Sequence, residues 1–254
     1  MLWLIHALQQ EMPMYANAPI PDHPEERWLL LRALFNVRPP APLTEEFQAV
    51  EGAFLEQMTR EKGIVQPADI KRSASDPRLS LWQGDITRLA VDAIVNAANS
   101  QLLGCFQPNH GCIDNIEQTM AGAEMRYACW QLMQEQGCEE PPGRAKITKG
   151  YHLPARYVLH TVGPIVRGKL TEAHKAQLAS CYASCLETAA AHHLEAIAFC
   201  CISTGVFRFP RQEAAEIAIH TVRQWLDRHP ATSVSQVIFD VFLDADRTIY
   251  QRLL

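Results

Sequence analysis

The chain has 254 residues, of which 48% are hydrophobic and 20% are charged. These values are ordinary for a globular protein, so disorder, collagen and coiled coil are excluded as descriptions of the whole chain. The formal net charge of −5 disfavours a protein that binds nucleic acid through a basic face.

The charge is distributed unevenly along the sequence. Residues 1–70 hold 10 acidic and 5 basic residues, whereas residues 71–254 hold 18 of each kind. The whole net charge therefore belongs to the first quarter of the chain. We predict two differently built parts, a helical N-terminal extension over residues 1–70 and a main domain over residues 71–254.

The opening segment MLWLIHALQQEM predicts a helix of a cytoplasmic protein. No Lys or Arg precedes its apolar stretch, and His6 interrupts it, which is unlike a signal peptide. No apolar run approaches the roughly 20 residues that cross a bilayer, so we expect no membrane partner.

Eight cysteines are present, and a chain of this size does not need disulfides to fold. We interpret the pairs Cys181/Cys185 and Cys200/Cys201 as small buried hydrophobic residues.

Two further helices are predicted in the extension. Asp22 is expected to cap the first, with Pro24 in its first turn and an apolar stretch after it. The run VRPPAP at residues 37–42 must end that helix, because proline cannot continue it. Thr44 is expected to cap the second helix. Residues 61–78 are polar, contain two prolines and are predicted to connect to the main domain.

From residue 79 onward the pattern predicts alternating strands and helices. The expected strands are residues 79–82, 93–96, 146–152, 157–160, 196–202 and 237–242. The expected helices are residues 113–136, 171–193, 210–228 and 244–254, the last capped by Asp244. This alternation indicates an α/β sandwich with a central sheet covered on both faces, whose ligands bind in loops beyond the strand ends.

Three of those loops have the composition of anion-binding sites. They are residues 84–87 (GDIT), 96–100 (NAANS) and 203–207 (STGVF). Ser, Thr and Gly at a helix entrance offer hydroxyl and backbone N–H groups to a phosphate. Alone this composition is a weak signal, and on its own the run Ser203-Thr204-Gly205 favours an ordinary turn.

A fourth loop, residues 105–112 (CFQPNHGC), has the ligands of a metal site. Cys105, His110 and Cys112 supply two thiols and an imidazole, which suit zinc. Three clustered ligands leave one position open, as in catalytic zinc sites. The alternative is three unrelated residues in a surface loop. Asp114, two residues further on, is either a general base beside the metal or an acid favoured by the helix dipole.

These motifs together resemble the macrodomains, a family of ADP-ribose-binding α/β/α modules. The resemblance is carried by residues 84–87, by residues 91–100 (VDAIVNAANS), by residues 143–164 (GRAKITKGYHLPARYVLHTVGP) and by residues 202–210. The motifs occur in the family's order, which is far more specific than any one of them. The resemblance implies a three-layer α/β/α macrodomain with a central mixed sheet.

One stretch departs from the common pattern and indicates a subfamily. Hydrolytic macrodomains mostly carry a glycine run where this chain has residues 104–114 (GCFQPNHGCID). The stretch resembles the zinc-dependent microbial subfamily, which holds its metal with such a Cys-His-Cys loop. That subfamily also has a helical N-terminal extension with a run similar to residues 36–42.

The resemblance implies a hydrolase that removes mono-ADP-ribose from acidic side chains of proteins, with one Zn²⁺ per chain. Some members are encoded with a sirtuin-type transferase and a lipoylated carrier protein, which is the implied substrate. The rivals are an ADP-ribose reader without catalysis, a structural or redox-sensing zinc site, and a nucleic-acid module, which the neutral main domain disfavours.

The same resemblance assigns roles to single residues. Asp85 and Ile86 would bind the adenine, with Phe242 near the same ring. Asn99 would bond the distal ribose, and Asp114 would act as base or stabilise charge at the anomeric carbon. The diphosphate would be wrapped by Ser203, Thr204, Gly205, Val206 and Phe207, and the metal ligands would be Cys105, His110 and Cys112. Position 208 is often Gly in the wider family and is Arg208 here.

Overall fold

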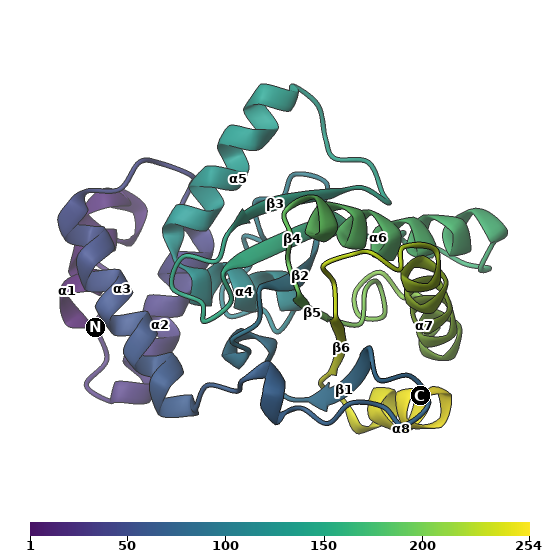
Figure 1. The fold of residues 1–254 in the computed structure, drawn as a ribbon. Helices are drawn as coiled ribbons and strands as arrows, with labels where there is room; N and C mark the ends of the chain where they lie inside the picture. Colours follow the sequence, from purple (N-terminus) through teal and green to yellow (C-terminus); the bar gives the residue numbers. More distant parts are fainter.

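The structure of the protein, a computed structural model, describes all residues from 1 to 254 (Figure 1). The helices are α1 (Leu2–Glu11), α2 (Pro24–Val37), α3 (Glu45–Lys62), α4 (Ile113–Ala121), α5 (Ala123–Gln136), α6 (Glu172–Ala191), α7 (Arg211–Arg228) and α8 (Asp244–Leu253). The strands are β1 (Leu79–Gln83), β2 (Ala93–Ala98), β3 (Ala145–Lys149), β4 (Tyr157–Val162), β5 (Ala196–Phe199) and β6 (Gln236–Val241). Short 3-10 helices occupy Pro13–Tyr15, Pro67–Asp69 and Ile86–Arg88.

The six strands form one mixed sheet in the order β1-β6-β5-β2-β4-β3. All neighbours are parallel except β3, which pairs antiparallel with β4 at the edge of the sheet. The central strands are buried along nearly their whole length, as expected for a parallel sheet with helices on both faces. The carboxyl ends of β2, β5 and β6 lie together at one edge.

Helices cover both faces and complete three layers. Helices α6, α7 and α8 lie on one face, and α4 and α5 lie on the other (Figure 1). The sheet and its helices share one apolar cluster of 47 buried residues. The predicted three-layer α/β/α architecture with a mixed central sheet is therefore confirmed.

Helices α1–α3 form a second, smaller unit, which we call the N-terminal unit, and it packs beside α4 and α5 (Figure 1). It has its own cluster of nine buried apolar residues. Thr44 caps α3 as predicted, because its hydroxyl accepts from the Phe47 N–H. The prediction for Asp22 is wrong. Residue His23 occupies the N-cap of α2 without a side-chain bond, and Pro24 takes the first helical position.

Several predicted boundaries differ from the structure because of local backbone geometry. The single helix expected over residues 113–136 is two helices separated by Gly122, whose φ of 93° is accessible mainly to glycine. Strand β3 ends at Lys149, since the chain turns at Gly150, and β5 ends at Phe199. Asp244 does not cap α8 but lies in its first turn, with Leu243 at the N-cap.

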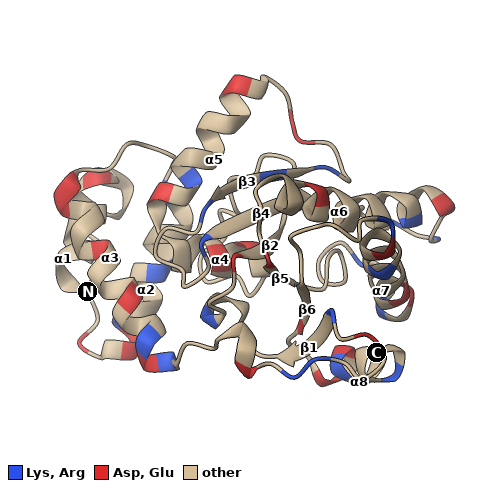
Figure 2. Cartoon of the chain, viewed as in Figure 1, with Lys and Arg blue, Asp and Glu red and all other residues tan.

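The distribution of charge follows no single face in the view of Figure 2, where acidic and basic residues are interspersed over the N-terminal unit. No helix is both long enough and apolar enough to span a bilayer. All eight cysteines are unpaired. Cys181, Cys185 and Cys200 are buried as predicted, but the prediction is wrong for Cys201, which is only partly buried because it lies beyond the end of β5 and lines the pocket.

Candidate functional site

A pocket of about 590 Å³ opens at the carboxyl ends of β2, β5 and β6. Residues 97–99 end β2, residues 200 and 201 follow β5, and Asp240 lies near the end of β6. This is the edge at which open parallel sheets bind their ligands. Two loops contribute separate walls of the pocket. We call residues 104–112 the metal loop and residues 203–209 the diphosphate loop.

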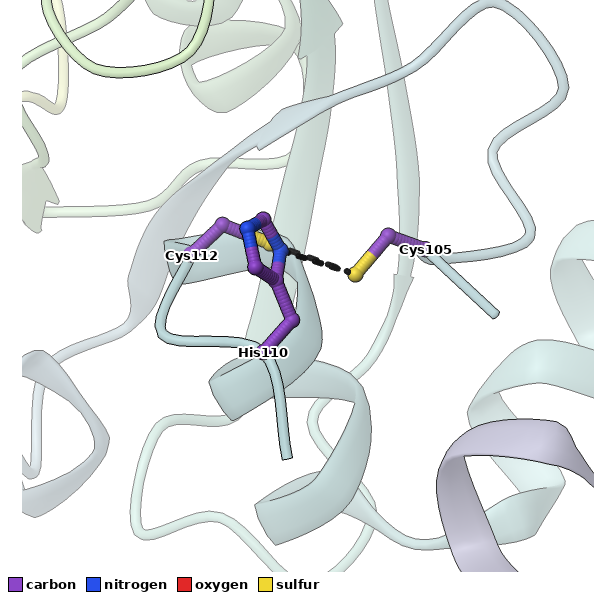
Figure 3. A group of neighbouring side chains, drawn as sticks. All are labelled: Cys105, His110 and Cys112. Carbon is purple, nitrogen blue, oxygen red and sulfur yellow. Dashed lines mark hydrogen bonds between the residues drawn. The ribbon is translucent and has the colours of Figure 1, made fainter. Parts of the chain in front are cut away.

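The metal loop brings its three predicted ligands together (Figure 3). The Sγ atom of Cys105 lies 3.3 Å from Nδ1 of His110 and 3.5 Å from Sγ of Cys112. All three donor atoms lie within 4.8 Å of one another, and all three residues line the pocket. Two thiols and an imidazole suit zinc, so these residues could together hold such a metal ion.

The thiols are held by the start of α4. Cys112 is the N-cap residue of that helix, and its Sγ accepts from the Asn115 N–H at 3.4 Å. The Asn115 side chain donates to Sγ of Cys105 at 3.5 Å. Burial raises the pKa of the Cys112 thiol to about 12. Binding of a metal ion would displace this proton, because a cysteine ligates as the thiolate.

Asp114 follows in the first turn of α4 and lies beneath the metal loop. It lines the pocket and is 5% exposed, and its Oδ1 accepts from the Asn96 amide at 2.8 Å. Burial raises the pKa of Asp114 to about 6, against the Asn96 bond and the charge of Arg126. The carboxyl group therefore exchanges a proton near neutral pH, as a general base must.

A buried chain of polar groups orients Asn96. Its amide nitrogen lies 3.2 Å from Nδ1 of His160, and Nε2 of His160 lies 2.8 Å from the Thr148 hydroxyl. Burial lowers the pKa of His160 to about 4, so the ring is neutral and accepts at Nδ1. The amide of Asn96 can then donate its two N–H groups to Asp114 and His160 at once.

The diphosphate loop is held by its own backbone bonds. Arg208 N–H donates to the Gly205 carbonyl at 3.0 Å, and Phe209 N–H donates to the Ser203 carbonyl at 2.9 Å. The N–H groups of Gly205, Val206 and Phe207 donate to no protein acceptor. A turn that leaves successive N–H groups unused is suited to an anion.

The backbone of this loop is strained at two positions. Ser203 and Arg208 have φ values of 65° and 58°, in the left-handed region that favours glycine. A Cβ on Gly163 would lie 2.0 Å from the Ser203 hydroxyl oxygen. Glycine at position 163 therefore permits β4 and the diphosphate loop to approach each other.

Of the three residues predicted to bind adenine, only one lines the pocket. Phe242 lines the pocket and is 73% exposed, so its ring is available for a ligand. Asp85 and Ile86 do not line the pocket. The Asp85 carboxylate accepts from the Thr87 N–H and hydroxyl and from Lys62. Burial would raise the pKa of Asp85, but these partners outweigh it and lower the pKa.

Asn99 lines the pocket, but in this structure its side chain serves the loop. Its amide donates to the Gly104 carbonyl at 2.9 Å and accepts from the Gln101 N–H at 3.0 Å. The amide keeps a second N–H donor and a second lone pair on Oδ1, so Asn99 can bond a ribose hydroxyl without giving up these partners.

Several residues in the pocket or supporting it from behind escaped the sequence analysis. Asn96 and His160 lie inside motifs that were noticed, but nothing in the sequence separates them from their neighbours. Asp240 gave a clearer signal, since it is an acid within the apolar run VIFDVF. It is 5% exposed, and its Oδ1 has no partner. The ion pair of Arg211 and Asp246 also lines the pocket.

The Macro domain family model matches residues 95–218 of the chain. A protein of Treponema medium named Protein-ADP-ribose hydrolase is 48% identical over 255 aligned residues, which cover all of this chain and 97% of the relative.

Two solved structures are similar in fold. The macrodomain of Trypanosoma brucei in complex with ADP-ribose has a TM-score of 0.68 and 29% identity, covering 92% of this chain and 96% of that one. The macrodomain of Oceanobacillus iheyensis with ADP has a TM-score of 0.61 and 37% identity. It covers only 68% of this chain, although 88% of its own length is matched.

Proposed function

The chain belongs to the Macro domain family, and we propose that it is a zinc-dependent hydrolase that removes mono-ADP-ribose from acidic side chains of proteins. One observation carries the proposal. The metal loop, the buried carboxyl of Asp114 and the unused N–H groups of the diphosphate loop line a single pocket. The name and full-length similarity of the Treponema relative support the hydrolytic activity.

In this proposal the substrate lies across the pocket from Phe242 to the metal loop. The adenine stacks on Phe242, and the N–H groups of Gly205, Val206 and Phe207 bind the diphosphate. Since the metal loop lines the same pocket, the distal ribose and its bond to the protein are proposed to lie beside it. Asn99 is proposed to bond that ribose, and Asp85 and Ile86 to bind the adenine after a local adjustment.

We assign one Zn²⁺ per chain to Cys105, His110 and Cys112. When bound there, it supplies a Lewis acid that polarises a water or a substrate hydroxyl. The residues of the chain orient the reacting groups around it. Asp114 lies against the same wall and accepts the proton of the attacking water or stabilises positive charge at the anomeric carbon.

The reaction consumes one water and yields ADP-ribose and the free carboxylic acid of the protein. Water attacks either the anomeric carbon or the ester carbonyl. Release in ¹⁸O-labelled water separates the two routes, because the label ends in ADP-ribose in the first and in the protein carboxyl in the second.

The test pairs metal analysis of the purified protein with a release assay before and after chelation. The substrate is a protein that carries mono-ADP-ribose on an acidic side chain. We expect one zinc per chain, release that stops on chelation, and recovery when zinc is returned. Turnover that survives complete removal of zinc would exclude the catalytic role of the metal loop. Binding of ADP-ribose without release would favour the reader instead.

A redox-sensing zinc site has one observation in its favour, the 3.5 Å between the Sγ atoms of Cys105 and Cys112. Oxidation of these thiols would eject the metal. The same release assay with a peroxide-treated protein tests it, since a sensor regains activity after reduction and resupply of zinc.

We propose that the modified protein is a lipoylated carrier and that a sirtuin-type transferase supplies the modification, in the cytoplasm. The family resemblance of the metal loop and of residues 36–42 supports the partners. The eight unpaired cysteines fit a reducing compartment. Incubation with modified carrier proteins, with and without the lipoyl group, tests the choice of substrate.

A further inference from the structure

Helix α2 of the N-terminal unit lies against the metal loop, and one of its side chains binds the loop directly. Nη2 of Arg32 donates to the His110 carbonyl at 2.7 Å and to Oδ1 of Asn115 at 2.9 Å. Arg32 therefore connects α2 directly to His110, one of the proposed metal ligands. It also binds Asn115, which contacts the other two.

A second residue of α2 binds the loop from one turn further on. Asn36 is fully buried, and its Oδ1 accepts from the Asn109 N–H at 2.9 Å. Its amide nitrogen donates to the Thr119 hydroxyl on α4 at 3.0 Å. Asn109 has a φ of 56°, so this bond fixes the loop at a strained residue, next to His110.

A third connection runs in the opposite direction, from α5 to α2. Nη1 of Arg126 donates to the carbonyl oxygens of Phe35 at 2.8 Å and Arg38 at 2.6 Å. The same guanidinium lies 4.8 Å from the centroid of the Phe106 ring, which belongs to the metal loop. The buried side chain of Arg126 thus connects the end of α2 to Phe106 in the first half of the metal loop.

Asn115 passes these contacts to the sulfur atoms. While Oδ1 accepts from Arg32, its Nδ2 donates to the carbonyl of Gln107 at 3.1 Å and to Sγ of Cys105 at 3.5 Å. Its backbone N–H donates to Sγ of Cys112. Every proposed metal ligand is therefore at most two hydrogen bonds from Arg32.

The metal loop needs such support, because it contains neither a helix nor a strand. Its three ligands come from eight consecutive residues, whose backbone freedom is lost when the metal binds. Residues that hydrogen-bond to the ligands and hold them in place before the metal binds reduce this loss of backbone freedom. Their substitution typically changes metal affinity by about 10- to 100-fold.

The solved relatives add a separate argument. The Oceanobacillus macrodomain holds ADP although about a third of this chain has no counterpart in it. That macrodomain therefore holds ADP without a counterpart of the unmatched part of this chain.

We propose that the N-terminal unit positions the metal loop, with Arg32 and Asn36 as positioning residues that hold the ligands in place before the metal binds. This inference rests on the proposed function for the identity of the metal. The contacts themselves are independent of it. Neither side chain lines the pocket, so both residues act through the loop and not on the substrate.

The first experiment measures how fast zinc passes from the loaded full-length protein to a chelating dye. We expect Arg32→Met to release zinc about 10 to 100 times faster than the unaltered protein. Arg32→Lys keeps a positive charge beside Cys105 and Cys112, but its ammonium lies on a shorter side chain than the Nη2 that makes both bonds, so an intermediate rate is expected. The matched control is Arg27→Met on the same helix, whose side chain donates to the Pro21 carbonyl and pairs with Asp22.

Two further readouts separate positioning from general stability. We expect the Arg32 variants to bind ADP-ribose with unchanged affinity and to unfold at the same temperature as the Arg27 control. We expect kcat to fall while KM for the modified protein stays the same. Zinc release at the control rate would overturn the proposal.

A measurement without metal distinguishes failure of this inference from failure of the proposed function. Amide hydrogen exchange at Asn109 is compared between the unaltered protein and Asn36→Ala, both free of metal. The Asn109 N–H is the readout because it donates to Asn36. Faster exchange confined to residues 105–112 supports positioning even if the purified protein carries no zinc. Unchanged exchange there excludes it, whatever the metal content.

Discussion

The two walls of the pocket are held by different parts of the chain. The metal loop is fixed by side chains from outside it, namely Arg32, Asn36, Arg126 and Asn115. The diphosphate loop is held by bonds within residues 203–209, by two bonds from Thr204 to the Cys201 carbonyl and by one from the Val166 N–H to the Phe207 carbonyl. The first wall therefore depends on the N-terminal unit, whereas the second depends on its own turn.

This difference matches the chemistry proposed for each wall. Metal ligands must be held to a few tenths of an ångström, so their support extends far into the protein. An anion needs only unused N–H groups, and the exposed tip at Gly205 and Val206 leaves room for a ligand to approach. Substitutions in the first wall should change turnover, and those in the second should change affinity.

The largest effect is expected from Asp114→Asn in the first wall. Asparagine cannot accept a proton, so turnover should fall by about 10²- to 10⁴-fold, as is typical for loss of a general base. The hydrogen bond from Asn96 is partly retained, and we expect the affinity for ADP-ribose to stay unchanged. Single-turnover release and calorimetric titration measure the two quantities.

The control for this substitution is Asp244→Asn, since Asp244 lies outside the pocket. If Asp114→Asn instead lost affinity for ADP-ribose and kept normal turnover at saturating substrate, the first wall would serve binding and not catalysis.

The next effect concerns the unit that supports the first wall. Glu51 on α3 is fully buried, and its Oε1 accepts from the Ala123 N–H at the start of α5. Burial raises its pKa from 4.5 to about 7, while Ala123 and Arg38 oppose the shift and Glu124 adds to it. His152 lies 3.8 Å from the other carboxylate oxygen.

Because the folded state holds this proton more tightly than the unfolded state, the free energy of unfolding should fall as pH rises from about 4.5 to 7. The loss is on the order of 2–3 kcal/mol. Chemical denaturation measures the free energy of unfolding as a function of pH. Glu51→Gln should remove most of its decrease between pH 4.5 and 7. Glu46→Gln, at an exposed residue of the same helix, should leave that decrease unchanged. An unaltered slope in the first variant would contradict the assignment.

Phe242→Ala tests the proposed adenine-binding part of the pocket. Phe242 belongs to neither the metal loop nor the diphosphate loop. The ring is mostly exposed, so its loss should not affect unfolding. Stacking on a base contributes about 1–3 kcal/mol, and we expect ADP-ribose affinity to fall by about tenfold. Ribose 5-phosphate, which lacks the base, serves as the control ligand. Equal losses for both ligands would show that Phe242 does not contact the adenine.

Sequence patterns predicted the architecture because it depends on periodicity and on short motifs. Strands, helices and the order of loops follow from apolar spacing, and the metal loop follows from three ligand residues within eight positions. Boundaries such as the break at Gly122 depend on single backbone angles, which composition does not reveal.

Long-range support could not be predicted in the same way. Arg32 and Asn36 lie 78 and 73 residues before the loop residues that they bind, and no local pattern distinguishes them from other polar residues of α2. The placement of Asp85 is a related case. Its motif is recognisable, but only the structure shows its carboxylate paired with Thr87 and Lys62 and outside the pocket lining.

The smallest effect compares one glycine from each wall. A Cβ added at Gly205 or at Gly111 meets nothing within 4 Å, and neither residue has a positive φ. Both alanine variants should therefore fold normally, with the free energy of unfolding raised by about 0.4–1 kcal/mol through loss of freedom in the unfolded chain.

Only a bound ligand can then distinguish the two positions. If the diphosphate lies against the backbone of the second wall, Gly205→Ala should weaken ADP-ribose binding several-fold, since the new methyl group occupies the space next to the N–H donors. Gly111→Ala should instead slow turnover, because residue 111 separates two proposed metal ligands. Calorimetry and the release assay on both variants measure this. The opposite result, with weaker binding only in Gly111→Ala, would place the diphosphate against the metal loop and remove the distinction between the two walls.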